Sequence, residues 1–87
     1  MNNAELKTAL RNGPYAWPGG YPVYFITDNG GVLSYKTVRN NLRLVFGAYP
    51  GDGWKVAGHE INWEDGELFD DHTGERIESA YAETESA

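Results

Sequence analysis

The most constraining feature of this 87-residue sequence is a set of apolar residues, in its middle third, that repeat with the spacing of an α-helix. Apolar residues recur at i, i+4, i+7, i+8 and i+11, the spacing of one helix face. They are Val38, Leu42, Val45, Phe46 and Tyr49. Ser34 with Thr37 supplies a start before this run, and Pro50-Gly51 ends it. The sequence therefore predicts one principal helix over residues 37–49.

Strand patterns lie on both sides of this helix. Residues 23–27 and 32–33 flank Asn29-Gly30, and Asn-Gly between apolar runs predicts a hairpin whose two central residues have positive φ. Residues 54–63 are also strand-like, and their apolar phase changes near Gly58, which predicts a β-bulge there. These patterns predict an α+β fold, a short antiparallel sheet packed on one main helix.

The two ends of the chain complete the predicted domain. Residues 4–11 have the pattern of a short helix capped by Asn2 or Asn3 and ended by Gly13-Pro14. Residues 68–77 predict a closing hairpin with a polar tip. We expect a single domain over residues 1–81 and a flexible C-terminal tail over residues 82–87.

Residues 14–22 combine three prolines with three aromatic rings, so they form neither a regular element nor a plain linker. We expect Tyr15, Trp17 and Tyr21 to cover the core. The alternative is an exposed aromatic surface through which a partner, or a second copy of the chain, binds.

Composition narrows the class of protein. The hydrophobic share is 40%, which favours a packed globule, and there is no apolar run of membrane-spanning length. There is no cysteine, which excludes disulfides and thiolate chemistry, and the N-terminus lacks the regions of a signal peptide. We expect a cytoplasmic protein.

Charge is divided unevenly along the chain. Residues 1–59 hold six Lys/Arg and three Asp/Glu, a balance of +3, whereas residues 60–87 hold one basic residue and ten acids, a balance of −9. Such an acidic surface repels nucleic acid and attracts basic protein surfaces. The alternative is that these two parts of the chain face each other, so that their opposite charges partly cancel.

Several segments together carry a resemblance that covers residues 12–82. They are residues 13–22 (GPYAWPGGYP), Val38-Arg39 with Asn41 and Arg43-Leu44, Asp52-Gly53-Trp54, residues 61–65 (INWED) and residues 74–81 (GERIESAY). In these segments the chain resembles a group of short, largely uncharacterised proteins from phages and other mobile elements of proteobacteria. Members of that group that carry two C-x-x-C pairs look like zinc ribbons.

The places of those cysteines hold Ser34, Thr37, Asp70 and Thr73 here. Hydroxyl groups are poor zinc ligands and one aspartate does not replace four thiolates. The resemblance therefore implies a degenerate zinc-ribbon-like corner, and we expect a native state with no metal and no cofactor.

Other chemistry finds little support in the sequence. A metal site would have to use His59, Asp70, Asp71 and His72, which lack the usual ligand spacing. There is no nucleophile motif, and acid pairs within an acidic stretch are not a hydrolase constellation. We expect a non-enzymatic protein.

We expect the acidic residues of the last third to bind a host protein with a basic nucleic-acid-binding surface, because an ordered acidic array imitates a row of phosphates. They are Glu60, Glu64, Asp65, Glu67, Asp70, Asp71, Glu75 and Glu78. By analogy with its phage-like relatives, the chain would be an anti-defence inhibitor, for example an anti-CRISPR protein that acts on an effector complex.

The alternative function is nucleic-acid binding. Lys36, Arg39 and Arg43 form a basic stripe beside the apolar helix face, and Lys55 adds a further cation. Tyr15, Trp17 or Tyr35 would then provide stacking surfaces for bases.

Overall fold

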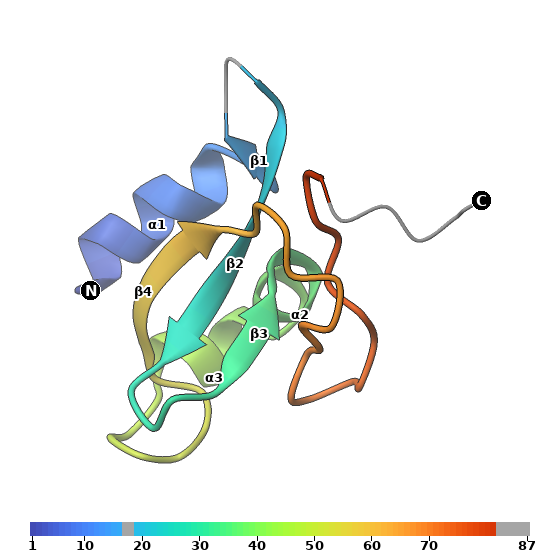
Figure 1. Cartoon of the computed structure of the whole chain (residues 1–87). Coiled ribbons are helices and arrows are strands. Elements are labelled where there is room, and N and C mark those ends of the chain that lie inside the picture. The colour runs from blue at the N-terminus through green and yellow to red at the C-terminus, as the bar shows by residue number, and fades with distance from the viewer. Residues whose placement is uncertain (17–18, 82–87) are drawn as a thin grey trace.

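The computed structural model describes residues 1–16 and 19–81, which form one α+β domain (Figure 1). Three helices and four strands make up this part of the chain. In chain order they are α1 (Asn3–Arg11), β1 (Tyr15–Ala16), β2 (Tyr21–Thr27), β3 (Val32–Ser34), α2 (Tyr35–Asn40), α3 (Leu42–Phe46) and β4 (Val56–Ile61). The predicted fold class is confirmed.

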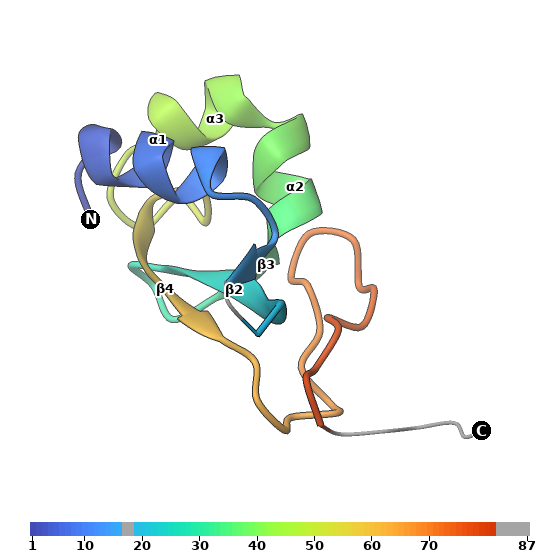
Figure 2. The same ribbon diagram turned by 90° about the horizontal axis from the view of Figure 1, so that it is seen from above.

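Strand β2 is the centre of the sheet and pairs antiparallel with each of the other three strands. Phe25 marks the register, because it lies opposite Leu33 of β3 and His59 of β4. Figure 2 shows the three helices on one face of this sheet, while residues 62–81 run beside β3 and α2. The domain thus has a helix layer, a sheet layer and an irregular C-terminal segment at one side.

The core lies between the helix layer and the sheet. Phe25 and Val38 have no exposed surface, as expected for side chains at the centre of a small core. The other buried members of this cluster are Leu6, Ala9, Leu10, Leu33, Val45 and Val56. Because they come from helices α1 to α3 and from strands β2 to β4, the core joins both halves of the chain.

The principal helix differs from its prediction over residues 37–49. Ser34 caps the start of α2 by accepting a hydrogen bond from the Thr37 N–H, as expected. At Asn41, however, φ is −132° and ψ is 42°, and its side-chain amide donates to the Thr37 carbonyl. Because this local bond competes with helix continuation, the helix divides into α2 and α3. Tyr49 lies beyond both and is 76% exposed.

Helix α1 follows its prediction closely. It begins at Asn3 with Asn2 as the N-cap, and Asn2 and Glu5 form a capping box. Gly13, with φ of 92°, follows the last turn, which is the left-handed conformation expected there.

The β2–β3 hairpin is confirmed, but its turn is different. Gly30 has a φ of 86° whereas no non-glycine residue of the described chain has a positive φ, so Asn29 does not adopt the expected conformation. The Gly30 N–H donates to the Thr27 carbonyl, and the Gly31 N–H donates to the Thr27 side chain. Because the Thr27 N–H also donates to the Gly31 carbonyl, the loop proper is residues 28–30. This three-residue loop with one left-handed glycine replaces the expected two-residue turn.

Strand β4 is shorter than the strand-like run over residues 54–63. Its pairing with β2 changes register between Ile26, opposite Gly58, and Thr27, opposite Val56. The predicted bulge near Gly58 is therefore confirmed. The predicted flexible tail, residues 82–87, lies outside the described residues. None of the helices in the described chain is long and apolar enough to span a membrane.

Candidate partner-binding surface

A buried aspartate organises the C-terminal segment. Asp70 is only 2% exposed, and its Oδ2 accepts a hydrogen bond of 2.7 Å from the Ser34 N–H. Its Oδ1 accepts from the N–H groups of His72 and Thr73 at 2.7 and 2.8 Å, and the Thr37 side chain also bonds to its carboxylate. The four positions of the expected corner, 34, 37, 70 and 73, therefore meet around one carboxylate.

The ionisation of Asp70 reflects this cage of donors. Burial by itself raises the pKa of a carboxyl group, but the hydrogen bonds from Thr37, Ser34, Thr73 and His72 outweigh it and lower the pKa of Asp70 from 3.8 to about 2. The carboxylate is therefore charged at neutral pH, and it holds the closing hairpin against the start of α2.

The closing hairpin itself is confirmed as a single antiparallel bridge between Phe69 and Arg76. Its tip also covers the free edge of β3, because the Asp71 N–H donates to the Val32 carbonyl and the Asp71 carboxylate accepts from the Val32 N–H. Such a covered edge does not recruit another strand.

A second buried polar residue, Asn62, fixes the rest of the segment. Its side-chain amide donates to the carbonyls of Asp65 and Glu78 at 3.1 and 3.0 Å, and its Oδ1 accepts from the Asp65 N–H. The Ala80 N–H donates back to the Asn62 carbonyl. The sequence did not single out Asn62, because an asparagine in a loop gives no sign of which distant carbonyls it will reach.

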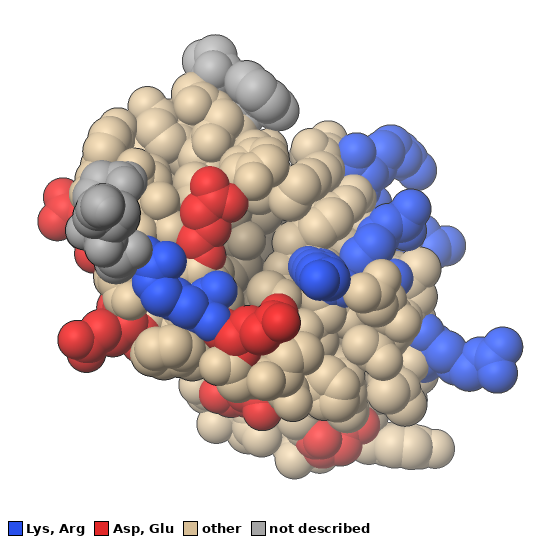
Figure 3. Space-filling view, turned by 90° about the vertical axis from the view of Figure 1, so that its right-hand side faces the viewer, with Lys and Arg blue, Asp and Glu red and all other residues tan. Residues whose placement is uncertain are grey.

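Seven of the eight predicted acidic residues are exposed, all except Asp70. The inclusion of Asp70 in the binding face is wrong, because its carboxylate is enclosed by its donors. The seven are Glu60, Glu64, Asp65, Glu67, Asp71, Glu75 and Glu78. Figure 3 shows acidic side chains over one part of this side of the molecule, with Lys or Arg atoms among them, and a group of basic side chains along the opposite border.

The basic stripe is exposed but interrupted. Lys36 and Arg39 lie on α2, and Arg43 lies on α3 beyond the break at Asn41. Tyr35, one of the expected stacking residues, is half-buried because its hydroxyl donates to the Leu10 carbonyl at 2.6 Å. It is therefore part of the structure that holds α1 and not a surface for bases.

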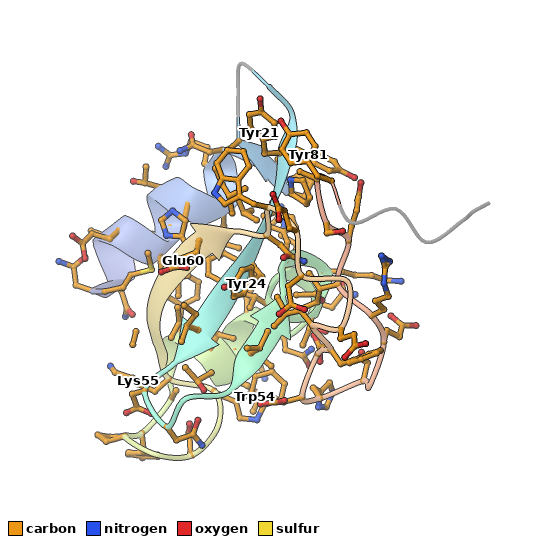
Figure 4. All side chains as sticks on the ribbon, in the orientation of Figure 1. Tyr21, Tyr24, Trp54, Lys55, Glu60 and Tyr81 are labelled. Carbon is orange, nitrogen blue, oxygen red and sulfur yellow. The ribbon has the colours of Figure 1, made fainter. Side chains whose placement is uncertain are left out.

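Three aromatic residues, Tyr21, Trp63 and Tyr81, form a separate cluster away from the core. Tyr21 lies 4.6 Å from Trp63, measured between ring centroids, and Trp63 stacks on Tyr81 with ring planes 10° apart. Trp63 is 47% and Tyr81 58% exposed, and Figure 4 shows Tyr21 and Tyr81 together at one end of the sheet. A hydrogen bond with Tyr21 raises the pKa of the Tyr81 hydroxyl.

The expectation that the aromatic loop covers the core is wrong for Tyr15 and Tyr21, since neither belongs to the core cluster. The Tyr15 hydroxyl instead donates to Glu78 at 2.8 Å, and this bond raises the pKa of the Tyr15 hydroxyl. Trp17 lies outside the described residues. Sequence reasoning missed Trp63 and Tyr81 because the partners of Tyr21 are more than 40 positions away in the chain.

The two histidines lie in unrelated surroundings. His59 belongs to β4, whereas the His72 ring packs edge-on against Trp54 at 4.9 Å. Within residues 1–16 and 19–81, no three His, Asp or Glu side chains converge as ligands for a metal ion.

The fold and this surface define a small α+β domain whose acidic residues are carried on an irregular but hydrogen-bonded segment. No family model matches the chain, and no curated protein or solved structure matches it either. The resemblance to phage proteins stays a prediction.

Proposed function

We propose that this chain is a non-enzymatic inhibitor that binds the basic nucleic-acid-binding surface of another protein through its acidic C-terminal segment. The observation that carries the proposal is that exposed carboxylates on residues 60–78 are attached to a backbone fixed by Asn62 and Asp70. A fixed array loses little conformational entropy on binding, so it competes with phosphates better than a flexible acidic tail.

The resemblance to phage proteins suggests the class of partner. Nucleases and CRISPR effector complexes hold their nucleic acids in positively charged channels, and a small acidic domain fits such a channel as a competitor. The proposed activity is therefore anti-defence inhibition, and it needs no cofactor.

The test is charge reversal at acids whose side chains form no bond that supports the fold. Within residues 1–16 and 19–81, Glu64, Glu67 and Glu75 meet this condition, whereas Asp65, Asp71 and Glu78 accept structural hydrogen bonds. We expect the triple variant E64K/E67K/E75K to fold normally and to lose capture of nucleic-acid-binding proteins from nuclease-treated bacterial lysate. Duplex DNA added to the wild-type complex should release the captured protein.

A matched control reverses the charge on the other side of the chain. The variant K36E/R39E/R43E should capture the same proteins as wild type. If the acidic variant still captures them, or if the captured protein holds DNA and this chain together, the proposal is wrong.

The alternative, direct nucleic-acid binding, is favoured by the exposed stripe of Lys36, Arg39 and Arg43. A gel shift with random duplex DNA at low salt tests it. Tight binding that K36E/R39E/R43E abolishes would replace the inhibitor proposal with the nucleic-acid one.

A further inference from the structure

Strand β4 leaves one of its edges without a partner strand. In the described part of the chain it pairs with β2 alone, and Figure 1 shows it at the left border of the sheet with α1 behind it. This contrasts with β3, whose free edge is covered by Asp71. An uncovered edge offers backbone hydrogen bonds to another chain.

The register shows which backbone groups point outward. The Asn62 N–H, directly after β4, donates to the Pro22 carbonyl. Because bonding direction alternates along an antiparallel strand, Glu60 and Gly58 also bond toward β2, while His59 and Ile61 direct their N–H and C=O groups away from it. The Ala57 carbonyl points the same way, and it accepts a bond from the amino group of Met1.

A groove lies between α1 and β4. It is a hollow of about 480 Å³ lined by Ala9 of α1 and by Ala57 and His59 of β4. His59 also borders two hollows of about 340 and 400 Å³, which reach across the sheet to Ala16 of β1 and Val23 of β2. The space next to His59 is therefore free to take a side chain of an added strand.

Side chains on the two faces of β4 differ in chemistry. His59 faces the helix layer, where its ring lies 5.9 Å from Phe25. Glu60 faces the opposite side of the sheet beside Tyr24, whose pKa is raised by burial and then by this carboxylate (Figure 4). An added strand would therefore place apolar side chains in the groove and a side chain opposite Glu60 that has to be basic.

We propose that the free edge of β4 binds an extended segment of a basic partner protein as an additional strand. The segment alternates apolar and Lys or Arg residues, so that the apolar ones enter the groove and the basic ones pair with Glu60. The net charge of −6 favours the same sign of partner. Pairing with a second copy is disfavoured because both copies carry that charge.

This site is separate from the acidic segment of the proposed function, apart from Glu60. It uses main-chain bonds for affinity and alternate side-chain positions for specificity, the pattern of β-strand addition. The test therefore has to distinguish backbone pairing from simple attraction between opposite charges.

The probe is an acetylated and amidated octapeptide that alternates valine and lysine. We expect it to bind and to slow amide hydrogen exchange at His59 and Ile61 by at least about tenfold, because these N–H groups gain partners. A peptide of four valines followed by four lysines has the same charge but not the alternation, and it should bind at least about tenfold more weakly.

Methylation of the peptide backbone supplies the sharpest control. When the peptide pairs antiparallel to β4 with valines opposite His59 and Ile61, valine N–H groups face β4 and lysine N–H groups face solvent. N-methylation of the valines should weaken binding by at least about tenfold, whereas N-methylation of the lysines should leave it unchanged.

A protein variant tests the same edge. His59→Pro removes an outward N–H that β2 does not use, so the sheet should tolerate it, while peptide binding is lost. His59→Ala removes the same ring but keeps the N–H, so it is the reference for His59→Pro, which should bind the peptide at least about tenfold more weakly than His59→Ala. Three results would each overturn the proposal. The first is that the peptide of four valines followed by four lysines binds as tightly as the alternating one, and the second is that both methylations have equal effects. The third is that amide protection rises with protein concentration in the absence of peptide.

Discussion

At the scale of single residues, the Asp70 carboxylate connects two segments that lie 36 positions apart. A buried charge is stable only when donors surround it. Here the donors are backbone N–H groups of the hairpin tip, the N–H group of Ser34 at the end of β3, and the side chain of Thr37. One aspartate therefore fixes the position of the whole tip.

Asp70→Asn should destabilise the domain by at least about 2 kcal/mol, because an amide nitrogen would face the Ser34 N–H and a charge-assisted bond would be lost. Urea unfolding followed by tryptophan fluorescence measures the change. Asp71→Asn is the matched control, since Asp71 is exposed, and it should cost less than about 1 kcal/mol. Equal losses for the two variants would contradict this role of Asp70.

The same carboxylate predicts a pH dependence of stability. The folded-state pKa of about 2 is lower than the ordinary value of 3.8, so the folded state favours the charged form. This contribution, about 2 kcal/mol, is present above pH 4 and is lost as the pH falls toward 2. Unfolding free energies between pH 6 and pH 2 should fall more steeply for wild type than for Asp70→Asn, and parallel curves would exclude the effect.

At the scale of elements, short-range patterns decided where helices and strands begin, and side-chain bonds decided where they break. Ser34 starts α2 as its position predicts, but the Asn41 amide bonds to Thr37 and divides the helix. In the β2–β3 hairpin, Thr27 binds the Gly31 N–H and so selects a three-residue loop. Both differences come from polar side chains with a backbone group within reach.

The hairpin loop should depend on the left-handed conformation of Gly30. A methyl group at Gly30 meets no atom within 4 Å, so Gly30→Ala tests backbone strain alone and should destabilise the domain by about 1 kcal/mol. Gly58→Ala is the control, because Gly58 has equal space but no positive φ, and it should not destabilise. Thermal unfolding monitored by circular dichroism distinguishes the two, and equal effects would show that the loop does not require glycine.

At the scale of the whole molecule, the charged side chains and the exposed aromatic rings occupy partly separate surfaces. Acidic side chains follow residues 60–78 with Arg76 among them, and a basic stripe follows α2 and α3. The aromatic cluster of Tyr21, Trp63 and Tyr81 lies at one end of the sheet. Among the residues that the structure describes, Asp70 is the only ionisable side chain that is fully buried. The binding surfaces can therefore be altered separately from the fold.

The corner should be stable without metal, because hydrogen bonds to Asp70 join the positions that thiolates would occupy in a zinc ribbon. We expect elemental analysis of the purified protein to show no stoichiometric zinc. Treatment with a chelator should leave the urea midpoint unchanged, whereas a structural zinc domain would unfold. One tightly bound zinc per chain would contradict this expectation.

The sequence by itself determined the α+β class, the positions of α1, the hairpin and the bulge, and the uneven charge, because all of these depend on short-range periods, caps and composition. Only the tertiary structure decided that Asp70 is buried, that Asn62 fixes residues 62–81, that Tyr21 packs on Trp63 and that β4 keeps a free edge. Each of these depends on which distant groups meet, and a linear pattern of residues does not contain that information.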